Sequence, residues 1–219
     1  PTGSLLRWAA RKKALAAALA AALTLGLAAI AGFFLFLRES GRDQPRLTLV
    51  FQDDFSRPDG KDEGPDWWDK DDGAQIKDGV LSVRRGWIAL SRKISGDVRL
   101  EFDAWLSEKD DSSLGGFINA FEGHWNGYAA WFSGPGGIGL EFQRLSGHGL
   151  VGPKKTTASA RRRRFALDHR NNRVSIEADG EEVLDFLDLD ALSDSGQARL
   201  GLMGSGGEAF FDNVSVLVL

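Results

Sequence analysis

Apolar and polar positions divide this chain at about residue 46 into two parts of different character. The first part holds an uncharged run at 14–37, ALAAALAAALTLGLAAIAGFFLFL. An α-helix rises about 1.5 Å per residue, so this run would cover roughly 36 Å, and the hydrocarbon core of a bilayer is about 30 Å thick. The pattern therefore predicts a transmembrane helix at 14–37, between a basic tail at 1–13 and a charged linker at 38–46.

From residue 47 to residue 219 the pattern changes to short runs of alternating apolar and polar residues, separated by glycine. Period-two alternation that is rich in β-branched and aromatic residues is typical of strands. Thirteen runs qualify: 47–55, 74–79, 80–85, 86–92, 97–106, 115–121, 128–132, 137–145, 163–169, 173–180, 181–186, 197–203 and 209–219. Asp78-Gly79 and Asp179-Gly180 lie between runs and predict hairpins. The expected fold is all-β, a two-sheet antiparallel jelly-roll sandwich behind one N-terminal transmembrane helix.

Composition and charge exclude several classes of function. The chain has no cysteine, which excludes disulfides and thiolate metal sites, and its three histidines are widely scattered. Seven Lys/Arg and two Asp/Glu give residues 1–46 a charge of +5. The other 20 Lys/Arg and 29 Asp/Glu give residues 47–219 a charge of −9. An acidic body argues against nucleic acid as a partner. The basic residues before the uncharged run favour a single-pass protein with a cytoplasmic N-terminus and a periplasmic or otherwise extracytoplasmic β-domain.

Small residues recur along the predicted helix at intervals of four. Ala16, Ala20, Thr24, Ala28 and Gly32 form one such ridge, and small residues let a neighbouring transmembrane helix approach closely. This packing face predicts other integral membrane subunits as partners, alongside the lipid bilayer. Alanine used simply as apolar filler is one alternative interpretation, and a cleaved secretory signal ending near Gly32 is another.

Four stretches of the β-rich part occur in a familiar order: FQDDFSR at 51–57, DWWDKDDGAQIKDGVLSV at 66–83, GYAAWF at 127–132 and AFFDNVSVLVL at 209–219. In this order they resemble the concanavalin A-like lectin/glucanase superfamily, in particular its laminin G-like and 3-keto-disaccharide hydrolase-like branches. The resemblance spans residues 49–219 and implies a sandwich whose first and last strands pair. Many such domains hold a structural calcium ion near these strands, which would implicate Asp54 and Asp212. No other metal or cofactor is expected.

One stretch, RLEFDAWLSE at 99–108, resembles the catalytic strand of family-16 glycoside hydrolases. Those enzymes carry Glu-x-Asp-x-Glu, or a version with one extra residue before the last Glu, and a retaining mechanism needs both outer carboxylates. The resemblance places Glu101 at the nucleophile and Asp103 at the helper position, but Trp105 or Leu106 at the acid/base position. Neither of these side chains transfers a proton. The sequence therefore predicts that the protein is not such an enzyme.

Aromatic residues and a basic run supply further candidate sites. Exposed indoles stack on sugars and also anchor protein interfaces. The candidate ligand or partner contacts are Trp105, Trp125, Tyr128 and Trp131, with Glu101 and Asp103 beside Trp105 on the outward face of one strand. The candidate basic patch comprises Lys154, Lys155, Arg161, Arg162, Arg163 and Arg164, and near a membrane it would face lipid phosphates or an acidic subunit. The alternative for the aromatic residues is packing in the core, and the alternative for the basic run is charge at a solvated strand edge.

These observations favour a non-catalytic, membrane-anchored β-sandwich subunit that scaffolds a larger membrane complex. A reaction-centre–antenna or respiratory assembly would fit such a subunit. The alternative is a carbohydrate-binding module of the cell envelope that uses Trp105, Trp125 and Trp131. A third hypothesis is a glycoside hydrolase of the keto-disaccharide type, whose catalytic residues the pattern does not identify.

Overall fold

The computed structural model describes residues 46–61, 63–69, 73–94, 96–107, 112–120, 127–133, 140–144, 148–154, 160–188 and 199–219, with the backbone alone at 140–144 and 148–154. The predicted transmembrane helix at 14–37 and its packing face from Ala16 to Gly32 lie outside this part, as do Trp125 and Lys155. The described residues include no helix of the length and apolar character that a membrane crossing requires.

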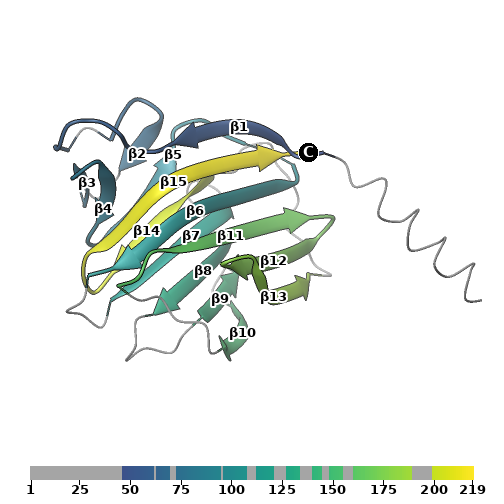
Figure 1. Cartoon of the computed structure of the whole chain (residues 1–219). Coiled ribbons are helices and arrows are strands. Elements are labelled where there is room, and N and C mark those ends of the chain that lie inside the picture. Colours follow the sequence, from purple (N-terminus) through teal and green to yellow (C-terminus); the bar gives the residue numbers. More distant parts are fainter. Residues whose placement is uncertain are drawn as a thin grey trace, which may run out of the picture. The chain divides into compact units, whose positions relative to one another are not determined.

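The described residues form fifteen strands and no helix, and the strands make two antiparallel sheets that lie face to face (Figure 1). The eight-stranded sheet has the order β13 (Glu181–Leu187), β12 (Arg173–Ala178), β11 (Arg163–Arg170), β6 (Val98–Leu106), β15 (Ala209–Val218), β4 (Val80–Val83) and β3 (Ala74–Lys77), with β1 (Thr48–Asp53) also beside β15. The seven-stranded sheet has the order β10 (His148–Lys154), β9 (Leu140–Arg144), β8 (Tyr128–Ser133), β7 (Ser113–Ala120), β14 (Arg199–Ser205), β5 (Gly86–Leu90) and β2 (Trp67–Asp69). The prediction of an all-β jelly-roll sandwich is confirmed.

Each of the thirteen runs predicted to be strands overlaps one, but the pattern misses β2 and β10. β2 is only three residues long and lies within an acidic stretch that reads as a loop. β10 has the sequence HGLVGPK, and its two glycines and one proline disfavour a strand. Both missed strands are edge strands, where such residues are tolerated.

Two Asp-Gly pairs make the hairpins that the sequence predicts. Asp78-Gly79 joins β3 to β4 with φ values of 54° and 73°, and Asp179-Gly180 joins β12 to β13 with 53° and 80°. Two successive positive φ values are typical of the type I′ turn, whose twist matches the strands that it joins. Asn171-Asn172 joins β11 to β12 with φ values of 49° and 65° and no glycine. Asparagine tolerates this left-handed region better than most residues.

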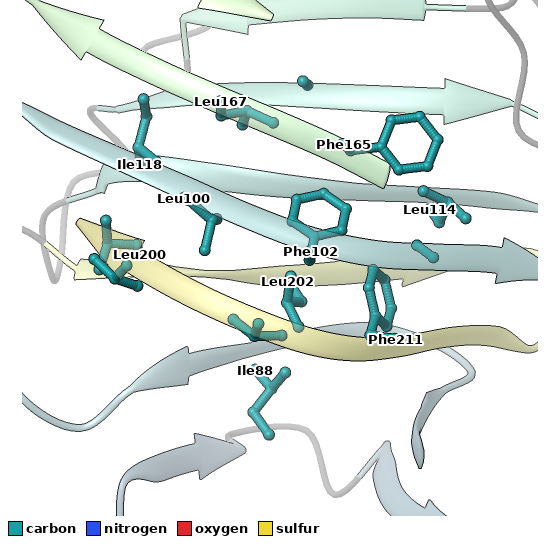
Figure 2. Packing of buried hydrophobic residues seen from close by; sticks show 14 of the residues in the cluster. Ile88, Leu100, Phe102, Leu114, Ile118, Phe165, Leu167, Leu200, Leu202 and Phe211 are labelled. Carbon is teal, nitrogen blue, oxygen red and sulfur yellow. The ribbon is translucent and has the colours of Figure 1, made fainter. Parts of the chain in front are cut away.

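The hydrophobic core lies between the two sheets. Every second residue of β6 from Val98 to Leu106 is buried, which confirms the phase predicted from its alternation. Figure 2 shows side chains of the two sheets meeting between the layers, with Phe102, Phe165 and Phe211 close to one another. The ring of Phe102 lies 5.7 Å from that of Phe165 and 5.8 Å from that of Phe211. Each such buried side chain contributes about 1.5–3 kcal/mol to stability.

The motifs that carry the resemblance have local structural roles. In FQDDF, Phe55 is fully buried at a positive φ of 53°. Asp53 holds this conformation because its carboxylate accepts the Phe55 N–H at 2.8 Å. In FFDNV, β15 has a bulge relative to β6 between Asp212 and Ser215, and Asn213 adopts a φ of 47° there. The motifs therefore fix backbone shape at the first and last strands, which pair as the resemblance implies.

Candidate functional site

The outer face of the eight-stranded sheet carries Glu101 and Asp103, the acids that matched the hydrolase motif. Both project from β6 away from the core, with partly exposed side chains. The neighbouring strands β11 and β15 bring arginines and further acids to the same face. The result is an ion network of four arginines and five carboxylates: Arg99, Arg162, Arg164, Arg170, Glu101, Asp103, Asp168, Glu177 and Asp212.

Arg99 and Arg164 are the centres of the ion network. Arg99 donates to the two oxygens of Glu177 at 2.8 and 2.6 Å and to Glu101 at 2.7 Å. Arg164 donates to the second oxygen of Glu101 at 2.8 Å and to Asp103 at 3.2 Å. Paired Arg–carboxylate hydrogen bonds of this kind are the strong, geometrically defined ones. They join β6 to β11 and β12 across the outer face.

The same contacts favour the ionised forms of Glu101 and Asp103. Burial raises the pKa of the Glu101 carboxyl, but hydrogen bonds from Arg99 and Arg164 lower it by more, so its pKa lies below the usual value. Burial likewise raises the pKa of Asp103, and hydrogen bonds from Asn213 and two arginines bring it below the usual value. Glu101 and Asp103 therefore act as fixed anions that cross-link strands.

The arginines of the predicted basic patch at and just before the start of β11 point to different sides of the strand. Arg164 belongs to the ion network, and Arg162 lies 2.7 Å from the carboxylate of Asp212. Arg163 points the other way and pairs with Asp179 at 2.7 Å. Acids of the same domain thus neutralise these arginines, which gives no support to a lipid-binding surface. Of the remaining members, Arg161 is exposed, Lys154 lies on β10, and Lys155 is outside the described residues.

The predicted aromatic contacts do not form one site. Trp105 lies on the outer face of the eight-stranded sheet, where it stacks on Phe210 with ring centroids 5.6 Å apart. Trp131 lies on the outer face of the other sheet, packed against a second cluster of apolar residues. Tyr128 is fully buried between the sheets and donates its hydroxyl to Asp188 at 2.8 Å. The structure therefore separates these three residues.

The second apolar cluster is an aromatic face on the outside of the seven-stranded sheet. It consists of Trp68, Trp87, Phe117, Trp131 and Met203, with Ala89, Ala120 and Ala129 between them. Register aligns Trp131 of β8 with Gly115 of β7, Met203 of β14 and Trp87 of β5. The tryptophans remain partly exposed, whereas Phe117 and Met203 are buried beneath them.

The aromatic face has defined ring geometry. Trp68 meets Trp87 edge-on at 5.1 Å, and Trp87 meets Phe117 at 5.9 Å. The guanidinium of Arg199 lies 4.8 Å from the centroid of Trp68, a cation–π distance. Gly201 leaves the space that the Phe117 ring fills, because a Cβ on this glycine would lie 2.6 Å from that ring. The rings are therefore fixed in place before any ligand binds.

Sequence reasoning missed Trp87, and the adjacent Trp67 and Trp68 lie in different environments. Trp67 is buried, and its indole N–H donates to Asp53 at 2.7 Å, so only Trp68 belongs to the aromatic face. The available signal was alternation in GWIAL, where buried Ile88 places Trp87 on the opposite face of β5. Joining Trp87 to Trp131 requires the strand order of the sheet, which the pattern does not supply.

The candidate calcium residues have protein partners. Asp54 accepts the backbone N–H of Ser56 at 3.0 Å, and Asp212 accepts that of Asn213 at 2.7 Å while pairing with Arg162. Among the described residues, no three His, Asp or Glu side chains gather in a way that would hold a metal ion. The backbone bond at Asp212 is the turn-type interaction that short polar residues favour.

Comparison with known proteins finds solved structures of similar fold. No protein-family model matches the chain, and no curated protein does. The endo-β-1,3-glucanase from Pyrococcus furiosus is similar in structure with a TM-score of 0.57 and 10% identity, over 80% of this chain and 96% of that one. The carbohydrate recognition domain of Emp46p, potassium-bound, has a TM-score of 0.57 and 14% identity, over 75% and 94%. SCLam, a non-specific endo-β-1,3(4)-glucanase from family GH16, has a TM-score of 0.55 and 14% sequence identity. The match covers 79% of this chain and 91% of that one.

At these identities the likeness establishes the fold alone. The comparisons nevertheless contradict two expectations drawn from the sequence. Glycoside hydrolases and carbohydrate-recognition domains share this fold, so the non-catalytic scaffold subunit is not supported, and neither is the exclusion of an enzyme. The first expectation rested on small residues of the N-terminal run. The second rested on Trp105 or Leu106 at the acid/base position of the motif, whose two matching acids, Glu101 and Asp103, belong to the ion network.

Proposed function

We propose that residues 47–219 form a carbohydrate-binding domain whose glycan lies on the aromatic face. The observation that carries this proposal is the alignment of three partly exposed tryptophans, Trp68, Trp87 and Trp131, on one outer sheet face. Indole rings offer an apolar surface that matches the C–H face of a pyranose. Two hydroxyls, those of Ser113 and Ser133, lie 3.4 Å apart at one end of this face and supply hydrogen bonds to sugar hydroxyls.

The cellular setting follows from the N-terminal run. Residues 14–37 would anchor the protein in a membrane by one helix, with the N-terminus in the cytoplasm. The β-domain would then stand outside the membrane, where glycans of the cell envelope are its ligands.

The test is glycan binding by matched tryptophan variants. We expect Trp87→Ala and Trp131→Ala each to weaken binding of a glycan identified on an array by about tenfold, or ~1.4 kcal/mol. Trp105→Ala is the matched control, because this indole is also partly exposed and stacked but lies on the other sheet. Isothermal titration measures the affinities. Equal losses in all three variants, or no glycan bound, would contradict the proposal.

Hydrolysis of a bound glycan is the second candidate function, since glucanases share the fold. Glycoside hydrolysis uses a pair of carboxylates, and Glu141 of β9 is in register with Trp131 on the neighbouring strand. The same glycan panel, including disaccharides with a keto group, is therefore also read for released sugar. Released sugar would show that the protein hydrolyses the glycan. Binding without released sugar would show that it only recognises the glycan.

A further inference from the structure

A cavity of about 700 Å³ lies where the chain passes from β4 of one sheet to β5 of the other. Its described lining consists of Lys61, Gly73, Ala74, Gln75, Arg84, Arg85 and Gly86. We call this cavity the basic pocket. Its residues belong neither to the ion network nor to the aromatic face.

Backbone geometry fixes the walls of the basic pocket. Gly60, just before Lys61, pairs with Ile76 of β3 through two hydrogen bonds of 3.0 and 2.7 Å. A Cβ on Gly73 would lie 2.3 Å from the carbonyl oxygen of Arg85, so only glycine permits this close approach. Gly86 has a φ of 100°, a conformation that other residues rarely adopt. The cationic side chains are therefore carried by a defined backbone.

The described lining is cationic, with three basic residues and no Asp or Glu. Arg84 lies 3.7 Å from Glu208, and its side chain is 69% exposed. Glu208 is already engaged, since it also accepts from Lys77 at 3.3 Å and from Ser82 at 2.9 Å. One carboxylate thus serves two cations. In a domain of charge −9 such a site attracts anions locally, and guanidinium groups bind carboxylate and sulfate in paired geometry.

We infer that the basic pocket binds the anionic group of an acidic glycan, a carboxylate or a sulfate ester. This inference rests on the proposed function and names the ligand class. Gly86 lines the pocket, and the next residue along β5, Trp87, belongs to the aromatic face. A glycan stacked on Trp87 and extended past Gly86 would place a neighbouring sugar at the lining of the basic pocket, which includes Arg84 and Arg85. The amide of Gln75 adds a neutral donor to the same lining.

The experiment titrates the full chain with three oligosaccharides of equal length: a neutral glucan, a uronic-acid oligomer and a sulfated oligomer. We expect the double variant Arg84→Gln/Arg85→Gln to lose at least about tenfold in affinity for the anionic ligand, with a weaker dependence on salt. Affinity for the neutral glucan should stay unchanged. Arg173→Gln is the control, because Arg173 is exposed, paired with Asp185, and lies on β12 near the opposite edge of the sheet.

The outcomes separate the two proposals. Preference for the uronic-acid or the sulfated oligomer identifies the anionic group, and its loss in the double variant but not in Arg173→Gln supports the inference. Neutral and acidic oligomers that bind equally, or an acidic preference retained in the double variant, overturn the basic pocket and leave the proposed function standing. Lys61→Gln, which removes a third charge, repeats the test independently. Binding of none of the three oligomers would overturn both.

Discussion

At the scale of single residues, Asp53 is the polar side chain on which the first strand and the following loop depend. Its carboxylate is mostly buried and accepts hydrogen bonds from the Phe55 backbone, the Trp67 indole and Arg57. We expect Asp53→Ala to lower the free energy of unfolding by about 2–3 kcal/mol, because it leaves the buried indole N–H without its acceptor. The measurement is urea unfolding followed by tryptophan fluorescence.

Asp54→Ala is the control at the next position. The Asp54 carboxylate is exposed and accepts hydrogen bonds from Ser56 beside it. The unfolding midpoint of this variant should stay close to that of the original chain. A shift as large as that of Asp53→Ala would mean that the acidic pair acts through its charge and not through the specific bonds of Asp53.

At the scale of elements, the ion network makes the stability of the contacts between β6, β11 and β12 depend on pH. Hydrogen bonds from Arg99 lower the pKa of Glu177, and those from Arg99 and Arg164 outweigh burial to lower that of Glu101. Carboxyls with lowered pKa values stabilise the folded state above the unfolded pKa, and this contribution is lost as pH falls through the folded pKa. We therefore expect the thermal midpoint to fall as pH drops below about 4.5, the usual glutamate value.

The matched variant for this prediction is Glu101→Gln/Glu177→Gln, compared with the original chain by calorimetry from pH 7 to pH 3. It should be less stable at pH 7 and lose less on acidification, since two of the titrating groups are gone. Parallel curves for both chains would show that other carboxyls with lowered pKa values, such as those of Asp103 and Glu208, set the acid sensitivity.

The strands also show which structural features a sequence pattern can predict. Alternation alone predicts the buried and outward residues of β6, because side-chain direction in a strand is a local property. Strand order is not local, so the pattern could place Arg164 on β11 but could not place it against Glu101 of β6. For the same reason, the sequence does not predict that Trp131 and Trp87 lie on one face, although register aligns them across β8, β7, β14 and β5.

At the scale of the whole molecule, the chain combines a self-contained sandwich with an N-terminal segment of different chemistry. Leu47–Leu219 form one compact unit, and the buried core of the described residues lies entirely within it. Residues 47–219 produced alone should therefore unfold cooperatively, at a temperature within a few degrees of the full chain. Thermal unfolding followed by circular dichroism in the same mild detergent measures both proteins.

The uncharged run at 14–37 should then account for any difference in membrane behaviour between the two proteins. A membrane-spanning segment of this length buries enough apolar surface to hold a protein in a detergent phase, whereas the sandwich has a net charge of −9. After temperature-induced phase separation of a non-ionic detergent, the full chain should enter the detergent phase and residues 47–219 the aqueous phase. If both proteins enter the aqueous phase, the run does not anchor the domain. If both enter the detergent phase, an apolar surface of the sandwich itself, first of all the aromatic face, must hold the detergent.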